Sequence, residues 1–343
     1  MKFIHIGIGG FGAHWRKLLK ETDTVEVVGL VDVNDQVLKQ ACENDGYTPD
    51  ICFHSLEDAL KAVQAEAAVI STPPVFHRKD GVAAMEAGLD VISEKPMADS
   101  MDACRAIVSA VLATGRTYVV SQNYRYSPPM QTVADLMRSG RLGDIGQAEI
   151  SFYKGVDFGG GFRHEMKFPL IIDMAIHHFD LIRFVSGFDA LRVSGSSWNP
   201  PWSNYRGDCS STALFEMSNG ARILYNASWC SKGNYCDWNG NWHIECEKGT
   251  LTYGNGEIKV FDVPDLYTAE GTETVELTSP ELTQQAYILD EFIRCVRESG
   301  QPATRAVDNI RSIAMVFAAV EAMNTGSRVP VLDDSIRHLV EEG

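Results

Sequence analysis

A glycine-rich turn follows the first apolar run of the chain and limits what it can fold into: Gly7-Ile8-Gly9-Gly10-Phe11-Gly12. It fits the spacing G-x-G-x-x-G, whose first glycine permits a tight turn and whose second lets the backbone approach a pyrophosphate. The third glycine lets a helix pack closely on a strand. Because the turn follows a strand pattern and opens a helix pattern, it predicts a dinucleotide-binding βαβ unit with phosphates at the helix N-terminus.

The first 120 residues alternate short apolar runs with amphipathic stretches. The apolar runs are continuous rather than alternating, as expected of strands that are covered on both faces. This order of elements is typical of a doubly wound parallel sheet. The expected strands are Phe3–Gly7, Val25–Val31, Ala67–Ser71, Asp90–Ser93 and Thr117–Ser121. The expected helices lie near 11–21, 34–45, 55–64, 76–88 and 100–114, and Ser55 with Asp58 predicts a capping box for the third.

The second half of the chain has a different pattern, with alternating runs rich in Trp, Thr and Ser between residues 145 and 277. These runs predict a large, mostly antiparallel sheet, and Asn219-Gly220 is a hairpin signal between two of them. A helix is expected over Leu170–Val185. Two more helices are expected near 283–298 and 306–323.

We therefore predict an α/β protein with two domains, and a length of 343 residues is sufficient for both. The expected domains are an N-terminal Rossmann domain with a doubly wound parallel sheet (1–122) and a C-terminal α+β domain with a large open sheet (123–343). The C-terminal domain is expected to bind the substrate. It is also expected to form a homodimer or homotetramer, because one apolar face of a broad sheet invites burial against a second subunit.

Composition and charge exclude several classes of protein. The chain has 30 Lys and Arg against 46 Asp and Glu, a net charge of −16 that would repel a phosphate backbone, so nucleic-acid binding is not expected. No apolar run is long enough to span a membrane, and the first residues already form a strand pattern rather than a signal peptide. The eight cysteines lack C-x-x-C spacing, which favours reduced thiols in a cytoplasmic protein and predicts no metal site.

Asp32 indicates which dinucleotide the glycine turn would bind. It lies twenty residues after Gly12, at the end of the second expected strand. A carboxylate at this place binds the ribose hydroxyls and repels a 2′-phosphate, and no arginine follows within several residues. NAD is therefore expected, and NADP is less favoured.

Three further motifs carry polar side chains. Two of them follow expected strands at the carboxyl edge of the sheet, where doubly wound folds bind ligands. The third lies on an expected helix, where Asp173, His177 and Asp180 share one face by their spacing of i, i+4 and i+7. That face is either functional or a solvated surface, and the neighbouring His178 is more simply a structural histidine. The motifs are Ser71-Thr72-Pro73-Pro74-Val75-Phe76-His77, Glu94-Lys95-Pro96 and Asp173-Met174-Ala175-Ile176-His177-His178-Phe179-Asp180.

With these motifs the sequence resembles the glucose–fructose oxidoreductase / inositol dehydrogenase family (Gfo/Idh/MocA). The resemblance rests on the glycine turn, T-P-x-x-x-H, E-K-P and D-x-x-x-H-x-x-D in this order, and it covers essentially the whole chain. It implies a Rossmann domain followed by a large open sheet, with NAD(P)-dependent chemistry on sugars, polyols or their derivatives. Pro74 and Ala175 replace an asparagine and a glycine that are common in the family, so the substrate cannot be taken from any one member.

The resemblance also implies roles for individual residues. Lys95 corresponds to the active-site lysine, Asp173 to the acid on the helix and His177 to the general acid/base. A cis or strongly bent Lys95–Pro96 peptide is expected in the E-K-P turn. The expected cofactor-binding residues are Gly7, Ile8, Gly9, Gly10, Phe11, Gly12, Asp32, Ser71, Thr72, Pro73, His77, Glu94, Lys95 and Gln122. The expected substrate-binding residues are Asn123, Arg125, Asp173 and His177, together with Arg163 after the Gly159-Gly160-Gly161 run, which is otherwise a solvated loop arginine.

The chemistry of these side chains agrees with the oxidation of a secondary hydroxyl. Nicotinamide accepts a hydride from carbon, and an imidazole changes its charge near neutral pH and so suits the proton. A lysine ammonium can stabilise the developing alkoxide. The sequence therefore predicts an NAD-dependent dehydrogenase of sugars, inositol-like polyols or sugar derivatives. Two alternatives stay open, an NAD-dependent glycosidase of the same fold and a non-catalytic regulator that senses a sugar or NAD.

Overall fold

The computed structural model describes residues 1–233, 235–263, 265 and 271–342. The chain forms two compact units, which are described separately below. The first unit comprises Met1–Gln122, Gln285–Ile310 and Ser335–Gly343, and the second comprises Asn123–Gln284 and Arg311–Asp334. The expected domain limits, 1–122 and 123–343, stay a prediction.

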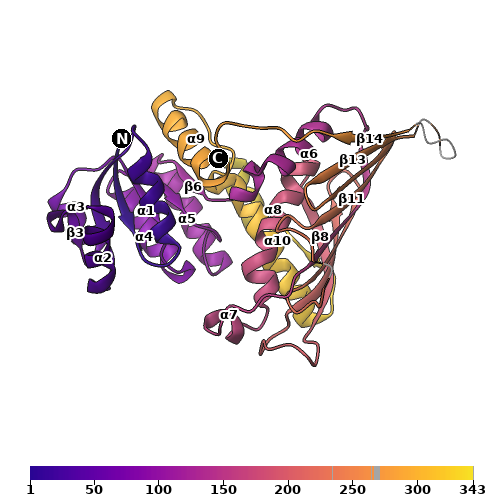
Figure 1. Ribbon diagram of the computed structural model, residues 1–343, viewed down its shortest axis with the longest axis horizontal. Helices are drawn as coiled ribbons and strands as arrows, with labels where there is room; N and C mark the ends of the chain where they lie inside the picture. The colour runs from indigo at the N-terminus through magenta and orange to yellow at the C-terminus, as the bar shows by residue number, and fades with distance from the viewer. Residues whose placement is uncertain (234, 264, 266–270, 343) are drawn as a thin grey trace. The chain divides into compact units, whose positions relative to one another are not determined.

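The first unit contains a parallel sheet of six strands in the order β3-β2-β1-β4-β5-β6. This is the doubly wound order of dinucleotide-binding folds, and it confirms the predicted fold class of this part. The strands are β1 (Lys2–Ile6), β2 (Glu26–Val31), β3 (Cys52–Phe53), β4 (Ala67–Ile70), β5 (Asp90–Ser93) and β6 (Tyr118–Val120). The helices are α1 (Gly12–Glu21), α2 (Asp35–Asp45), η1 (Pro49–Ile51), α3 (Leu56–Ala62), α4 (Pro74–Glu86), α5 (Met101–Thr114), α9 (Gln284–Glu298) and α11 (Asp334–Glu342) (Figure 1).

Helix ends in this unit follow local capping chemistry. The backbone N–H of Asp58 donates to Ser55 Oγ at 3.2 Å, and the Ser55 hydroxyl donates back to Asp58 Oδ2 at 2.7 Å, so α3 begins where the sequence predicts. At the end of α5, Gly115 adopts a φ of 66° and its N–H donates to Val111 O. That left-handed backbone favours glycine and ends the helix.

The second unit contains a sheet of nine strands in the order β14-β13-β12-β11-β7-β10-β9-β8-β15. Among the described strands, β7 and β10 pair in parallel and the other neighbours pair antiparallel, which confirms the mostly antiparallel sheet. The strands are β7 (Ile145–Tyr153), β8 (Ala190–Trp198), β9 (Ser210–Met217), β10 (Arg222–Ser228), β11 (Asn241–Cys246), β12 (Gly249–Gly254), β13 (Glu257–Asp262), β14 (Thr272–Val275) and β15 (Val329–Pro330).

Helices α8 (Ala175–Ser186) and α10 (Ala306–Thr325) lie along one face of this sheet, as Figure 1 shows. The second unit also contains η2 (Asn123–Tyr126), α6 (Pro128–Arg138) and α7 (Phe162–Glu165), together with most of α10. In the part of the chain that the structure describes, no helix has the length and hydropathy needed to cross a membrane.

The long helix expected over Leu170–Val185 is interrupted. Residues Leu170–Met174 form a π-helical turn, η3, and α8 begins only at Ala175 and ends at Ser186. Asp173 therefore lies on the π turn, and the regular i, i+4, i+7 face predicted for it does not hold across the junction. Turns of this kind inside helices are frequent at functional sites.

A buried ion pair joins η2 to α8. Arg125 donates to Asp180 through Nε at 2.6 Å and Nη2 at 2.7 Å, and the Ser312 hydroxyl donates to Asp180 Oδ1 at 2.7 Å. The side chains of Arg125 and Asp180 are only 6% and 2% exposed. Asp180, which the sequence placed on the functional helix face, thus holds η2, while substrate binding by Arg125 stays a prediction.

We expect Asp180→Ala to lower the free energy of unfolding of the second unit by about 3–5 kcal/mol, because it removes the carboxylate from a buried guanidinium. Urea denaturation followed by tryptophan fluorescence measures this, since Trp198, Trp202, Trp229, Trp238 and Trp242 all lie in this unit.

The matched control is Asp135→Ala, which removes an exposed pair with Arg138 at 2.8 Å and is expected to cost at most about 0.5 kcal/mol. Equal losses in the two variants would contradict a structural role for the buried pair.

Candidate active site

The turn between β1 and α1 has a backbone that requires glycine. Gly7 adopts a φ of 80°, and a Cβ atom there would lie 2.6 Å from Thr72 N. A Cβ on Gly12 would lie 2.1 Å from the Gly7 carbonyl oxygen, so only glycine lets α1 begin so close to β1. An added Cβ on Gly10 would meet no heavy atom of the described residues within 4 Å, which leaves open space beside the turn. These features fit a bound pyrophosphate.

Asp32 lies beside this turn, directly after β2. Its Oδ2 accepts a hydrogen bond from Gly9 N at 3.3 Å, and its Oδ1 accepts one from Asn34 N at 2.9 Å. The carboxylate is half-buried and is fixed next to the second glycine of the fingerprint. The structure therefore brings together the two elements from which the sequence predicts NAD binding, and Asp35 at the start of α2 adds a second negative charge.

The residues after β4 are tied to the glycine turn and to the E-K-P segment. The Ser71 hydroxyl donates to the Gly7 carbonyl oxygen at 2.8 Å. His77 is buried, and its ring nitrogens lie 2.7 Å from Thr72 O and 2.9 Å from Pro96 O. Burial lowers the pKa of His77. His77 thus joins two of the predicted motifs at the carboxyl edge of the sheet.

The Glu94-Lys95-Pro96 turn contains the predicted cis peptide between Lys95 and Pro96. Glu94 is buried, accepts a hydrogen bond from Trp15 Nε1 at 2.7 Å and accepts another from the backbone N–H of Lys95 at 3.2 Å. Burial raises the pKa of Glu94, and the Trp15 hydrogen bond and the Lys95 charge oppose this shift. Glu94 therefore fixes the backbone that carries Lys95, whose side chain is half-buried.

Gln122 is the last residue of the first unit before the chain enters η2. Its side chain is buried, and neither Nε2 nor Oε1 has a hydrogen-bond partner among the described residues. A buried amide without a partner costs about 1–3 kcal/mol. This agrees with the prediction that Gln122 pairs with a bound cofactor, which stays a prediction.

In the second unit, His177 of α8 stacks on Tyr124 of η2. The ring centroids are 4.0 Å apart and the planes differ by 13°. His177 is 6% exposed. Burial, followed by the charges of Asp173 and Asp237, raises the pKa of Tyr124. Sequence reasoning missed Tyr124, although it lies between Asn123 and Arg125, two of the expected substrate-binding residues.

Asp173 and Arg163 form an ion pair in the same unit. Arg163 Nε donates to Asp173 Oδ2 at 2.5 Å. The guanidinium also lies 4.7 Å from the ring centroids of both Phe158 and Phe162. The preceding residues Gly159–Gly161 all have positive φ values, between 70° and 95°, which favour glycine. The structure thus brings two of the predicted substrate-binding residues together at the end of the loop that contains Gly159–Gly161, which we call the glycine loop.

His178 has a different environment from His177. Its Nε2 donates to the Trp238 carbonyl oxygen at 2.9 Å, and its Nδ1 accepts from the Tyr225 hydroxyl at 2.9 Å. Burial lowers the pKa of His178 to about 4, so the ring is neutral at pH 7. These contacts agree with a structural histidine, and we therefore exclude His178 from the candidate site.

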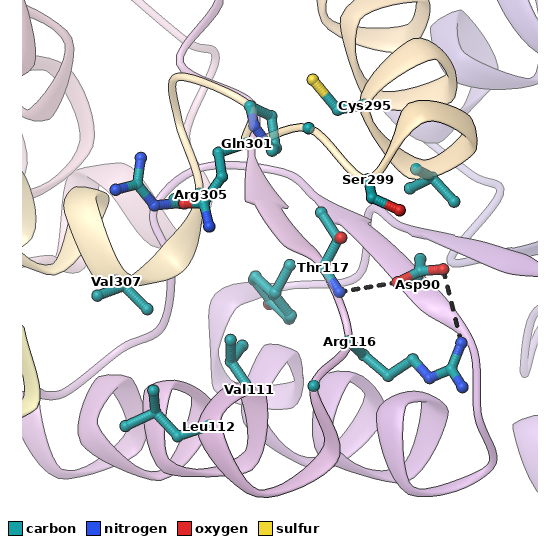
Figure 2. A pocket seen from close by; sticks show the side chains of 15 residues that line it. Asp90, Val111, Leu112, Arg116, Thr117, Cys295, Ser299, Gln301, Arg305 and Val307 are labelled. Carbon is teal, nitrogen blue, oxygen red and sulfur yellow. Dashed lines mark hydrogen bonds and ion pairs between the residues drawn. The ribbon is translucent and has the colours of Figure 1, made fainter. Parts of the chain in front are cut away.

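A cavity of about 390 Å³ lies elsewhere in the first unit. Figure 2 shows Asp90 there, bonded to the backbone N–H of Thr117 at 2.7 Å and paired with Arg116. Asp90 begins β5 and Thr117 precedes β6, so the cavity lies at the amino edge of the parallel sheet, opposite the glycine turn. It is therefore separate from the predicted cofactor site. Within the described ranges no three His, Cys, Asp or Glu side chains are grouped to hold a metal ion.

Comparison with known proteins identifies the family. Residues 1–122 match the model of an oxidoreductase family with an NAD-binding Rossmann fold, and residues 130–252 match the GFO/IDH/MocA C-terminal domain. The chain belongs to the Gfo/Idh/MocA oxidoreductase family. This confirms the resemblance inferred from the motifs, the oxidoreductase class and NAD as the cofactor.

Relatives of this Gfo/Idh/MocA chain match it over nearly its full length. An uncharacterized protein, y4oX of Sinorhizobium fredii, is 30% identical and covers 96% of this chain and 95% of its own. D-apiose dehydrogenase of Paraburkholderia graminis is 25% identical and covers 94% of this chain and 88% of its own. An oxidoreductase from Agrobacterium radiobacter, solved with NAD⁺, L-tartaric acid and magnesium, shares the fold with a TM-score of 0.86 at 21% identity, covering 96% and 98% of the two chains.

The position of Asp32 beside Gly9 predicts the cofactor preference. We expect NAD to bind more tightly than NADP, because Asp32 and Asp35 repel a 2′-phosphate. Isothermal titration of the wild type and of Asp32→Ala measures this, and the preference should narrow in the variant. Equal affinities in the wild type, or an unchanged preference in Asp32→Ala, would contradict the role of Asp32.

Proposed function

We propose that this protein oxidises a secondary hydroxyl of a sugar, an inositol-like polyol or a sugar derivative, with NAD as the acceptor. The observation that carries the proposal is the group on α8 and η3. On α8, the His177 imidazole stacks on Tyr124. Asp173 lies four residues earlier, in η3, and its carboxylate is paired with Arg163. A histidine, an acid and a guanidinium are suited to a polyhydroxylated substrate, and the similarity to D-apiose dehydrogenase supports this class.

The first unit would hold the cofactor through its own backbone and side chains. The N-terminus of α1 and the turn Gly7–Gly12 would bind the pyrophosphate, and Asp32 would bind the ribose hydroxyls. Ser71 and His77 would keep the adjoining loops in place through their bonds to Gly7 and Pro96. When bound, NAD supplies the acceptor for the hydride that leaves carbon.

Lys95 and His177 would act on the reacting hydroxyl. The His177 imidazole would take the hydroxyl proton, and the stacked Tyr124 would hold the plane of the ring. The Lys95 ammonium would donate a hydrogen bond to the same oxygen and stabilise its developing negative charge. The cis turn and Glu94 would fix the backbone from which Lys95 extends.

The Asp173–Arg163 pair would bind other hydroxyls of the substrate. A carboxylate accepts hydrogen bonds from hydroxyl groups, and a guanidinium donates to their oxygens, so the pair offers both functions side by side. Asn123, which is buried in η2, would add an amide to this set. We also propose a homodimer or homotetramer that forms through the sheet of the second unit, where Leu191, Trp198 and Leu214 are exposed.

Replacement of the catalytic groups tests the proposal. We expect His177→Ala to lower turnover by roughly 10²–10⁴-fold, the usual contribution of general acid–base catalysis, with cofactor affinity unchanged. Lys95→Ala should do comparable damage, and the double variant should be little worse than either single variant, because both groups act on one oxygen. Steady-state kinetics and NAD titration provide the measurements.

The matched control is His243→Ala, which removes an exposed histidine from β11 of the same unit. It should keep wild-type turnover. Near-normal turnover in His177→Ala would show that another group carries the proton.

The choice of substrate determines which reaction is observed. NADH formation should be measured over polyols, neutral aldoses, uronates and amino sugars. Net NADH production supports a dehydrogenase. Release of a sugar from a glycoside without net NADH would instead identify a glycosidase that uses bound NAD transiently. Tight binding of NAD and a sugar without turnover would identify a sensing protein.

A further inference from the structure

Two cysteines of the second unit lie close together at the end of neighbouring strands. Cys209 immediately precedes β9, and Cys230 follows β10 by two residues. The two Sγ atoms are 3.0 Å apart, about 1 Å more than a disulfide bond length of about 2.05 Å. The backbone sets this approach, because Ser210 pairs with Ser228 in the sheet and Trp229 N donates to Cys209 O at 2.9 Å.

The surroundings of the pair distinguish the two thiols. Cys209 is buried, and burial raises its pKa to about 12, so it stays a thiol near neutral pH. Cys230 is half-buried and can be reached from solvent. The Cys209 thiol donates to Cys230 Sγ, and the hydroxyls of Ser228 and Ser210 lie 3.4 and 3.6 Å from the same sulfur. Because Cys230 is the more exposed of the two, it is the thiol that an external disulfide reaches first.

The thiol pair also lies where both ends of the glycine loop are anchored. The start of the loop is tied to the segment of Cys230, since Gly155 forms a β-bridge with Cys230 and Val156 N donates to Trp229 O at 2.9 Å. This loop continues through Phe158 and Gly159–Gly161 to Arg163.

The end of the loop is tied to the segment of Cys209. Arg206 N donates to His164 O at 2.9 Å, and Asp208 N donates to Lys167 O at 2.8 Å. The approach at Gly207 is so close that a Cβ there would lie 2.0 Å from Met166 O. A bond between Cys209 and Cys230 would therefore join the two segments that hold the base of the loop carrying Arg163.

We propose that Cys209 and Cys230 are a reversible modification site. In the presence of a low-molecular-weight disulfide they form a disulfide bond, which links the two segments at the base of the glycine loop. The inference rests on the second unit alone and does not depend on the substrate or on the reaction proposed above. The cysteine spacing did not reveal this pair, because its two residues are 21 positions apart in the sequence.

The exchange balances with oxidised glutathione as the oxidant. The Cys230 thiolate attacks one sulfur of glutathione disulfide, so that the glutathione S–S bond breaks, a mixed disulfide forms and one glutathione thiolate leaves. Cys209 then loses its proton and attacks the Cys230 sulfur, and the second glutathione thiolate leaves. In total two protein thiols are oxidised, one glutathione disulfide is reduced, and the two protons end on the glutathione thiols.

Peptide mapping tests the site directly. The full chain is incubated with oxidised glutathione, free thiols are blocked with N-ethylmaleimide, and the digest is analysed by mass spectrometry. We expect loss of alkylation at both Cys209 and Cys230, a cross-linked peptide lighter by two hydrogens, and full recovery after dithiothreitol. Alkylation of both residues after this treatment would overturn the proposal.

Three variants test the order of the steps. Cys209→Ser should leave a stable glutathione adduct on Cys230, whereas Cys230→Ser should give neither an adduct at Cys209 nor a cross-link. Cys42→Ser is the matched control from the first unit, where the Sγ atoms of Cys42 and Cys52 are 3.6 Å apart. This variant should still form the cross-link between Cys209 and Cys230. An adduct on Cys209 in Cys230→Ser would contradict the assignment of Cys230 as the attacking thiol.

Amide hydrogen exchange tests whether the disulfide restrains the glycine loop. Oxidation should slow exchange over 155–167 and 199–209 and leave 1–122 unchanged, with reversal by dithiothreitol. A cross-linked protein whose exchange over 155–167 matches that of the reduced protein would overturn the coupling to the loop.

Discussion

The buried ion pair between Arg125 and Asp180 determines how the second unit presents its functional groups. It fixes η2 on α8 in a place that water does not reach, and Ser312 completes the coordination of the carboxylate. Because Tyr124 precedes Arg125 in η2, the same pair also sets the ring on which His177 stacks. If His177 takes the hydroxyl proton as proposed, its ring needs a fixed orientation, and the buried pair supports that orientation through Tyr124.

The two units carry different sets of the predicted site residues. In the first, glycines without Cβ atoms leave space beside the start of α1, and Asp32 lies next to them. Glu94, bonded to Trp15 and to the backbone of Lys95, sets the turn that carries the lysine. In the second, Asp173 pairs with Arg163 and His177 stacks on Tyr124, and these are the groups proposed to bind and deprotonate the substrate.

The sequence predicted features that have a distinct spacing pattern and missed those that leave no such pattern. The glycine turn, the Ser55 cap and the doubly wound parallel sheet follow from local spacing and from the restricted topology of such sheets, whereas the two-residue strand β3 (Cys52–Phe53) was not predicted. The π turn before α8 could not be foreseen, because apolar spacing does not separate it from a regular helix. The pairing of Arg125 with Asp180 spans 55 residues, so no motif revealed that the arginine already has a carboxylate partner.

The proposed function depends above all on joint action of Lys95 and His177 on one hydroxyl of a sugar or polyol. A crystal structure of the protein with NADH and a substrate identified by NADH formation tests this most directly. We expect the reacting hydroxyl oxygen to lie within about 3 Å of both Lys95 Nζ and a ring nitrogen of His177. A complex in which either group lies beyond hydrogen-bonding reach of that oxygen, without a water between them, would contradict it.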